Sequence, residues 1–88
     1  MRKFVLFTGS RIKLMKDMLK NGGLVRKKQK YYGTYLGFYF TTKLLQDYGL
    51  IKCGERTKNN EKVWVLTNKG REFIQRVEGI EKIIGEFD

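Results

Sequence analysis

Histidine is absent from this chain, and Cys53 is the one cysteine. Without histidine, neither a Ser–His nor a Cys–His pair can activate a nucleophile, and a lone cysteine forms neither an internal disulfide nor a Cys/His zinc site. Asp17, Asp47, Glu55 and Glu61 are scattered among lysines and arginines, where solvated roles are favoured over general acid–base catalysis. We therefore expect no enzyme, no catalytic residue, no metal and no cofactor.

Long apolar runs are also missing. No run approaches the ~20 residues of a membrane-spanning helix, and the apolar segment after Met1-Arg2-Lys3 is too short for a signal peptide. We expect an intracellular, cytoplasmic protein without membrane contact. The length of 88 residues allows one domain, whose modest core gains from dimerisation.

Acidic residues are scarce in the first four-fifths of the chain. Residues 1–71 hold 17 basic and 4 acidic residues, a net charge of +13, whereas residues 72–88 have a net charge of −3. The chain is 41% hydrophobic and 14% aromatic, which is enough for a folded core rather than a disordered basic tail. A basic body predicts a polyanionic partner. A lysine-rich face that serves solubility alone is the alternative.

Hydrophobic spacing predicts a first helix that begins after Ser10, a candidate N-cap. Ile12, Met15 and Leu19 recur at i, i+3 and i+7, and Gly22-Gly23 closes the helix. The preceding segment Phe4–Phe7 is too short for periodicity to separate a strand from a helical lead-in.

Two more helices are expected before the middle of the chain, at Val25–Tyr32 and at roughly Phe38–Asp47. In the first of these, Arg26, Lys27 and Lys28 would occupy the first turn, where positive charge opposes the helix macrodipole. Bound phosphates are the natural compensation for this cost.

A β-ribbon follows. Gly49 tolerates the left-handed conformation that ends a helix, and alternation places Ile51, Cys53, Trp64 and Leu66 on the inward face of two short strands. Cys53 is then a small inward residue, with a disulfide between two chains as the minor alternative. The loop between the strands is polar and basic, with Arg56, Lys58, Asn59 and Lys62 near its tip. These tip residues are expected to meet phosphate rather than only solvent.

Thr67 can cap a last helix, whose apolar residues form a heptad-like seam. The seam consists of Phe73, Val77, Ile80, Ile84 and Phe87, and Ile74 and Ile83 broaden it. Because the seam continues past what one small core can cover, a homodimer packed through this helix is favoured over a helix that folds back on its own domain.

Residues 31–40 form an aromatic block that could stack on unpaired bases. A small helical domain needs large side chains to fill its core, so Tyr31, Tyr32, Phe38 and Phe40 are predicted to be mostly buried. On the same helical wheel, Tyr35, Tyr39, Thr42, Lys43 and Gln46 lie on the outer side and are candidates for a major-groove face. Of these, Gln46 alone is a residue type that makes bidentate base contacts, so sequence discrimination is expected to be modest.

From Gly33 to about Arg76 the chain resembles winged helix-turn-helix transcription regulators. The similarity rests on Tyr48-Gly49-Leu50-Ile51 and Leu66-Thr67-Asn68-Lys69-Gly70 and is greatest to small archaeal proteins, including those of archaeal viruses and plasmids. The resemblance implies an intracellular homodimer on double-stranded DNA, with the third helix in the major groove and the ribbon, or wing, over the backbone or minor groove. It transfers Thr42, Lys43 and Gln46 as recognition-helix positions, and Lys58 and Asn59 as wing-tip positions.

The predicted fold class is mainly α with a small β-ribbon (α+β). It is a single winged helix-turn-helix domain over residues 1–88, with the wing at about 51–67 and a C-terminal dimerisation helix at about 68–87. The predicted contacts to DNA are Arg26, Lys27, Lys28, Lys30, Tyr35, Tyr39, Thr42, Lys43, Gln46, Arg56, Lys58, Asn59 and Lys62. A regulator and a general DNA-coating protein both fit this reading, and a protein-interaction module or a single-strand binder stays open as an alternative.

Overall fold

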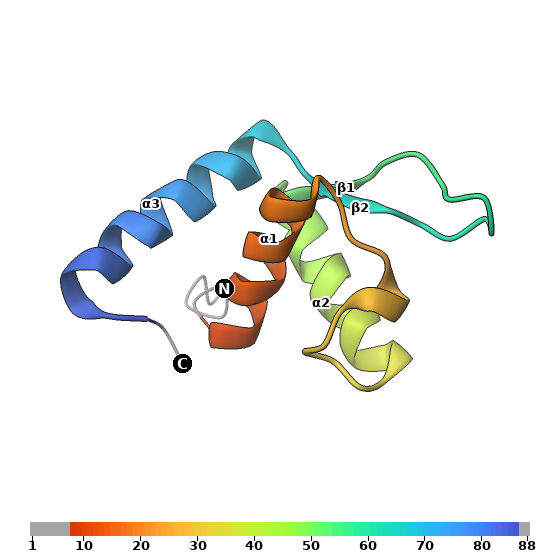
Figure 1. Cartoon of the computed structure of the whole chain (residues 1–88), viewed down its shortest axis with the longest axis horizontal. Coiled ribbons are helices and arrows are strands. Elements are labelled where there is room, and N and C mark those ends of the chain that lie inside the picture. Colours follow the sequence, from red (N-terminus) through yellow and green to blue (C-terminus); the bar gives the residue numbers. More distant parts are fainter. Residues whose placement is uncertain (1–7, 87–88) are drawn as a thin grey trace.

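The computed structural model describes residues 8–86 and shows a small domain of helices with one hairpin (Figure 1). Its elements are α1 (Gly9–Asn21), the short 3-10 turn η2 (Arg26–Lys28), α2 (Tyr35–Asp47), β1 (Ile51–Cys53), β2 (Trp64–Leu66) and α3 (Asn68–Ile84). The fold is mainly α with a two-stranded antiparallel sheet, as predicted, and its order is compatible with a winged helix. The question about Phe4–Phe7 lies outside the described residues.

Helix α1 lies at the centre of the domain and supplies much of the core. Its apolar face buries Ile12 and Met15, as the spacing predicted, together with Leu14 and Met18, whereas Leu19 of the predicted stripe is 36% exposed. The N-cap is Thr8 rather than Ser10, because the helix already includes Gly9. Helix α1 packs on β2 and α3, so it connects the hairpin to the last helix.

The predicted helix at Val25–Tyr32 is wrong. The backbone is extended on both sides of η2, since Leu24 exchanges two backbone hydrogen bonds with Trp64 (2.9 and 2.8 Å). Further on, the Gln29 side chain accepts hydrogen bonds from the backbone N–H groups of Tyr31 and Tyr32 (2.8 Å each), which replaces helical bonds. A three-residue turn has no appreciable macrodipole. The argument that Arg26, Lys27 and Lys28 oppose a helix macrodipole and therefore require phosphate does not apply to this segment.

The turn from α2 into the hairpin forms as predicted. Gly49 adopts a left-handed conformation with φ 74°, and Thr67 caps α3 by accepting a hydrogen bond from the N–H of Gly70. In the sheet, Ile51 pairs with Leu66 and Cys53 with Trp64. Ile51, Trp64 and Leu66 are buried, but Cys53 is exposed, against the prediction. Cys53 lies on the outer strand of the ribbon, because Trp64 opposite it is also paired with Leu24 on its other side.

The aromatic block divides between core and surface. Phe38 is buried, and Tyr31 and Tyr32 pack partly buried against the core. Phe40 is wrongly predicted, because it is 62% exposed. Two residues along a helix turn the side chain by about 200°, so Phe38 and Phe40 face opposite sides.

Tyr31 ties the segment after η2 to α1. Its hydroxyl donates a hydrogen bond of 3.0 Å to the Asp17 carboxylate. Burial, this hydrogen bond and the negative charge of Asp17 together raise the pKa of Tyr31 above its ordinary value of 10.0. The neutral hydroxyl therefore stays in place as a donor at neutral pH.

Candidate nucleic-acid interface

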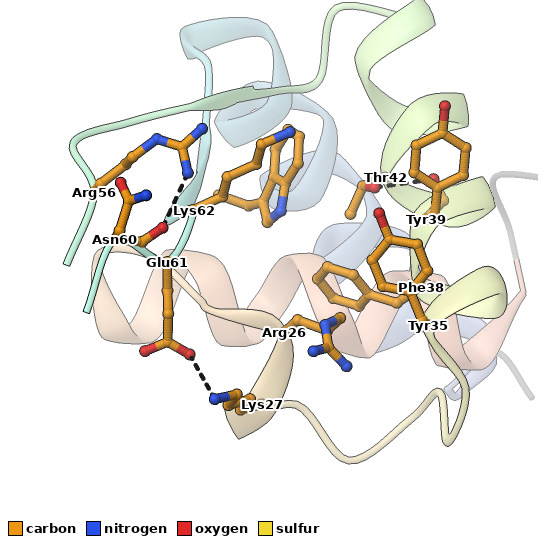
Figure 2. Close-up of a pocket in the computed structure, with 11 residues that line it drawn as sticks. Arg26, Lys27, Tyr35, Phe38, Tyr39, Thr42, Arg56, Asn60, Glu61 and Lys62 are labelled. Atoms are coloured by element: carbon orange, nitrogen blue, oxygen red, sulfur yellow. Dashed lines mark hydrogen bonds and ion pairs between the residues drawn. The ribbon is translucent and has the colours of Figure 1, made fainter.

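A groove with a volume of 290 Å³ opens between η2, α2 and the hairpin loop (Figure 2). We call it the basic groove. The Leu24–Trp64 backbone pairing creates it, because that pairing places η2 beside the base of the hairpin. The residues that line it are Arg26, Lys27, Tyr35, Phe38, Tyr39, Thr42, Arg56, Asn60, Glu61, Lys62 and Trp64.

Three cations of the groove are positioned by rings or by a carbonyl oxygen. The Arg26 guanidinium lies 5.4 Å from the ring centre of Tyr35, and Lys62 Nζ lies 5.7 Å from that of Trp64. Arg56 donates a hydrogen bond of 3.0 Å to the Asn60 carbonyl oxygen. None of these contacts neutralises the cation, so each keeps its charge available for an anion.

A fourth cation is held by a carboxylate. Lys27 Nζ lies 3.7 Å from Glu61 Oε2, and both side chains remain partly exposed (Figure 2). An exposed pair at this distance contributes little to stability. A phosphate oxygen can therefore replace Glu61 as the partner of Lys27 at small cost.

The hairpin loop is ordered by Thr57. Its hydroxyl accepts hydrogen bonds from the N–H groups of Asn59 (3.2 Å) and Glu61 (3.1 Å), and its own N–H bonds to the Glu61 carbonyl oxygen. Asn60 has φ 61° and completes the turn. These bonds hold Arg56 and Lys62 toward the groove, while Lys58 and Asn59 stay exposed at the tip.

The structure brings together about half of the residues predicted to contact DNA. Arg26, Lys27, Tyr35, Tyr39, Arg56 and Lys62 line the basic groove. Lys28 and Lys30 instead line a separate hollow beside α1, and Lys43 and Gln46 are exposed on α2 outside the groove. Asn60 and Glu61 also line the groove and were not predicted as contacts from the sequence, although both lie in the polar loop predicted between the two strands.

Thr42 is not on the outer face of α2, against the prediction. It is 3% exposed, and its hydroxyl donates a hydrogen bond of 3.0 Å to the Tyr39 carbonyl oxygen. Thr42 lies about 40° from buried Phe38 on the helical wheel, which places it at the floor of the groove. Its side chain is therefore unsuited to reading bases without a rearrangement of α2.

Helix α3 changes character along its length. Val77 and Ile74 are buried and Phe73 is partly buried, so the first half closes the domain's own core. Ile83 and Ile84 in the last turn are 83% and 69% exposed, and Ile80 is also exposed. Lys16 on α1 forms a 2.6 Å ion pair with Glu81, which anchors the helix between these two parts. Phe87 of the predicted seam lies outside the described residues.

Within residues 8–86, no group of His, Cys, Asp and Glu side chains could hold a metal ion. Across the same residues, no helix is long and apolar enough to cross a membrane. Comparisons with protein-family models, with curated proteins and with solved structures find no match to this chain. The argument for function therefore depends on the geometry and charge of the chain itself.

Proposed function

We propose that the protein is a winged helix-turn-helix DNA-binding protein that acts as a homodimer, with a role in transcription regulation. In this proposal α2 enters the major groove and the hairpin is the wing that lies on the backbone. The element order is compatible with this fold. The proposal includes an intracellular location and no catalytic activity, metal or cofactor.

The basic groove is the observation that carries the proposal. Its cations come from η2 and the wing, which meet beside α2 through the Lys27–Glu61 ion pair, and three of them are held by rings or a carbonyl oxygen. A duplex presents two rows of phosphates on either side of its major groove, and phosphate contacts position a protein on DNA. A cluster of cations beside α2 can bind one of these rows while α2 lies in the adjacent major groove.

The dimer is proposed to form through the exposed end of α3. Ile80 and Ile84 lie on the side of the helix that also carries Val77, so they extend the buried stripe into solvent. The hairpin and the C-terminal end of α3 lie at opposite ends of the molecule (Figure 1). Pairing through α3 would leave both basic grooves open to DNA.

Binding of duplex DNA should depend steeply on salt. If a dimer neutralises about six to eight phosphates, the logarithm of the association constant falls against the logarithm of salt concentration with a slope of about −5 to −7. Fluorescence anisotropy with a labelled random duplex and the matching single strand measures this slope. No binding at low salt, or affinity that does not change with salt, would contradict the proposal, and tighter binding to the single strand would favour the stacking alternative.

Arg56→Ala and Lys62→Ala should each weaken binding to all duplex sequences alike. Each lost phosphate contact should reduce the salt slope by about one for every bound subunit. Lys82→Ala is a matched control, because Lys82 is exposed in the last turn of α3, and that end of the helix lies away from the hairpin (Figure 1). If the control reduces the slope as much as the wing variants do, general charge rather than the basic groove holds the DNA.

A further inference from the structure

The outward side of α2 carries an apolar ridge beside the basic groove. Tyr35, Leu36, Tyr39 and Phe40 are all exposed, Leu36 and Phe40 by 60% and 62%. Tyr35 and Tyr39 stack with ring centres 6.0 Å apart, and the Phe40 ring meets Tyr39 edge-on at 5.7 Å. The three rings therefore form one continuous surface, and Leu36, one helical turn before Phe40, is next to it on the helix.

The side chains of this apolar ridge are not part of the hydrophobic core. Phe38 and Leu45 fill the core from the other side of the same helix, so α2 is apolar on both sides. Large apolar side chains exposed together on one helix are unfavourable in water and indicate a surface that is covered in a complex.

The charge around the ridge indicates the chemistry of its partner. Lys43 is exposed on the same helix, Arg26 lies against Tyr35, and the one acidic residue in α2 is Asp47 at its C-terminal end. The partner must therefore combine negative charge with apolar groups. The major groove of DNA does so, because phosphates border it and each thymine presents a C5-methyl group inside it.

We infer that Leu36 and Phe40 contact thymine methyl groups, so that the protein prefers DNA whose major groove carries these methyls. The inference rests on the proposed duplex binding and specifies what α2 reads. Tyr35 and Tyr39 line the basic groove, and the Tyr35 ring already holds Arg26. Leu36 and Phe40 do not line that groove and are exposed, so they are the part of the ridge that is free to enter the DNA.

The test compares two duplexes that differ only in the methyl group. One is a mixed-sequence duplex with thymine in both strands, and the other replaces every thymine with deoxyuridine. Burial of a methyl-sized group changes affinity by about fourfold, so the wild-type protein should bind the deoxyuridine duplex at least about fourfold more weakly for each methyl contacted. Anisotropy titrations at one salt concentration measure the ratio of the two dissociation constants.

Phe40→Ala and Leu36→Ala should each reduce this ratio toward one, because the side chain that would contact the methyl group is removed. Both side chains are mostly exposed, so the variants should keep the fold, which circular dichroism checks. Leu19→Ala, the same type of truncation at an exposed position of α1, should leave the ratio unchanged.

The possible failures are distinguishable. Equal affinity of the wild type for both duplexes, with a steep salt slope, would overturn the inference and leave duplex binding in place. A preference for thymine that survives both α2 variants would also overturn it. Failure to bind either duplex would remove the proposed function together with the inference. Binding to vesicles of anionic lipid that the thymine duplex does not displace would assign the ridge to a membrane surface instead.

Discussion

Replacing Gly70 with alanine is expected to lower the free energy of unfolding by about 3 to 5 kcal/mol, a loss at the upper end for single substitutions. A Cβ atom at this position would overlap the backbone carbonyl oxygen of Leu50 and also press on the Leu66 side chain. The Leu50 oxygen is held in place by a hydrogen bond of 3.0 Å from the N–H of Thr67. Helix α3 would have to move away from the hairpin, and urea unfolding followed by circular dichroism would measure the cost.

Gly79→Ala is the matched control on the same helix. No atom lies within 4 Å of a Cβ built there, so the change should stabilise the protein by about 0.8 to 1 kcal/mol through helix propensity alone. Opposite signs for the two variants are the expected result. Similar stability changes for the two variants would show that the close approach of α3 to the hairpin does not require a glycine at position 70.

Placing aspartate at both Ile80 and Ile84 is expected to convert the proposed dimer to a monomer and to lower affinity for a two-site duplex by about 10² to 10⁴. Carboxylates at these positions would have to be buried without a partner in the dimer. Because both residues are exposed within one chain, the fold itself should survive. Analytical ultracentrifugation gives the mass, and anisotropy gives the affinity.

The control for this pair is the double variant Gln75→Asp with Gly79→Asp. It adds two carboxylates to the same helix at exposed positions away from the side that carries Ile80 and Ile84. It should leave the mass unchanged. A wild-type chain that is already monomeric at tens of micromolar would instead mean that the end of α3 serves another purpose.

The accuracy of the predictions made from the sequence differs between elements. Gly49, Thr67 and the alternation at Ile51, Trp64 and Leu66 are local signals, since each depends on the conformation of a few neighbouring residues. These predictions were confirmed, except that Cys53 of the same alternation is exposed.

The errors arose where a distant contact changed a local preference. Residues 25–32 contain good helix formers, but the backbone bonds between Leu24 and Trp64 and the Gln29 side chain hold this segment out of a helix. The boundary of the buried side of α2 was also misplaced. Phe40 was predicted to be buried but is exposed, and Thr42 was predicted to be on the outer side but is buried. Periodicity gives the direction of a buried face, but the width of that face depends on which elements pack against it.

The sequence by itself determined the basic charge, the hairpin and the capped last helix, because these depend on composition and on short-range backbone chemistry. Only the tertiary structure decided which cations lie together. Arg26 and Lys62 are far apart in the chain and line one groove because the Leu24–Trp64 bridge joins η2 to the hairpin. The same packing leaves Leu36 and Phe40 in solvent, since the core side of α2 is already filled by Phe38 and Leu45.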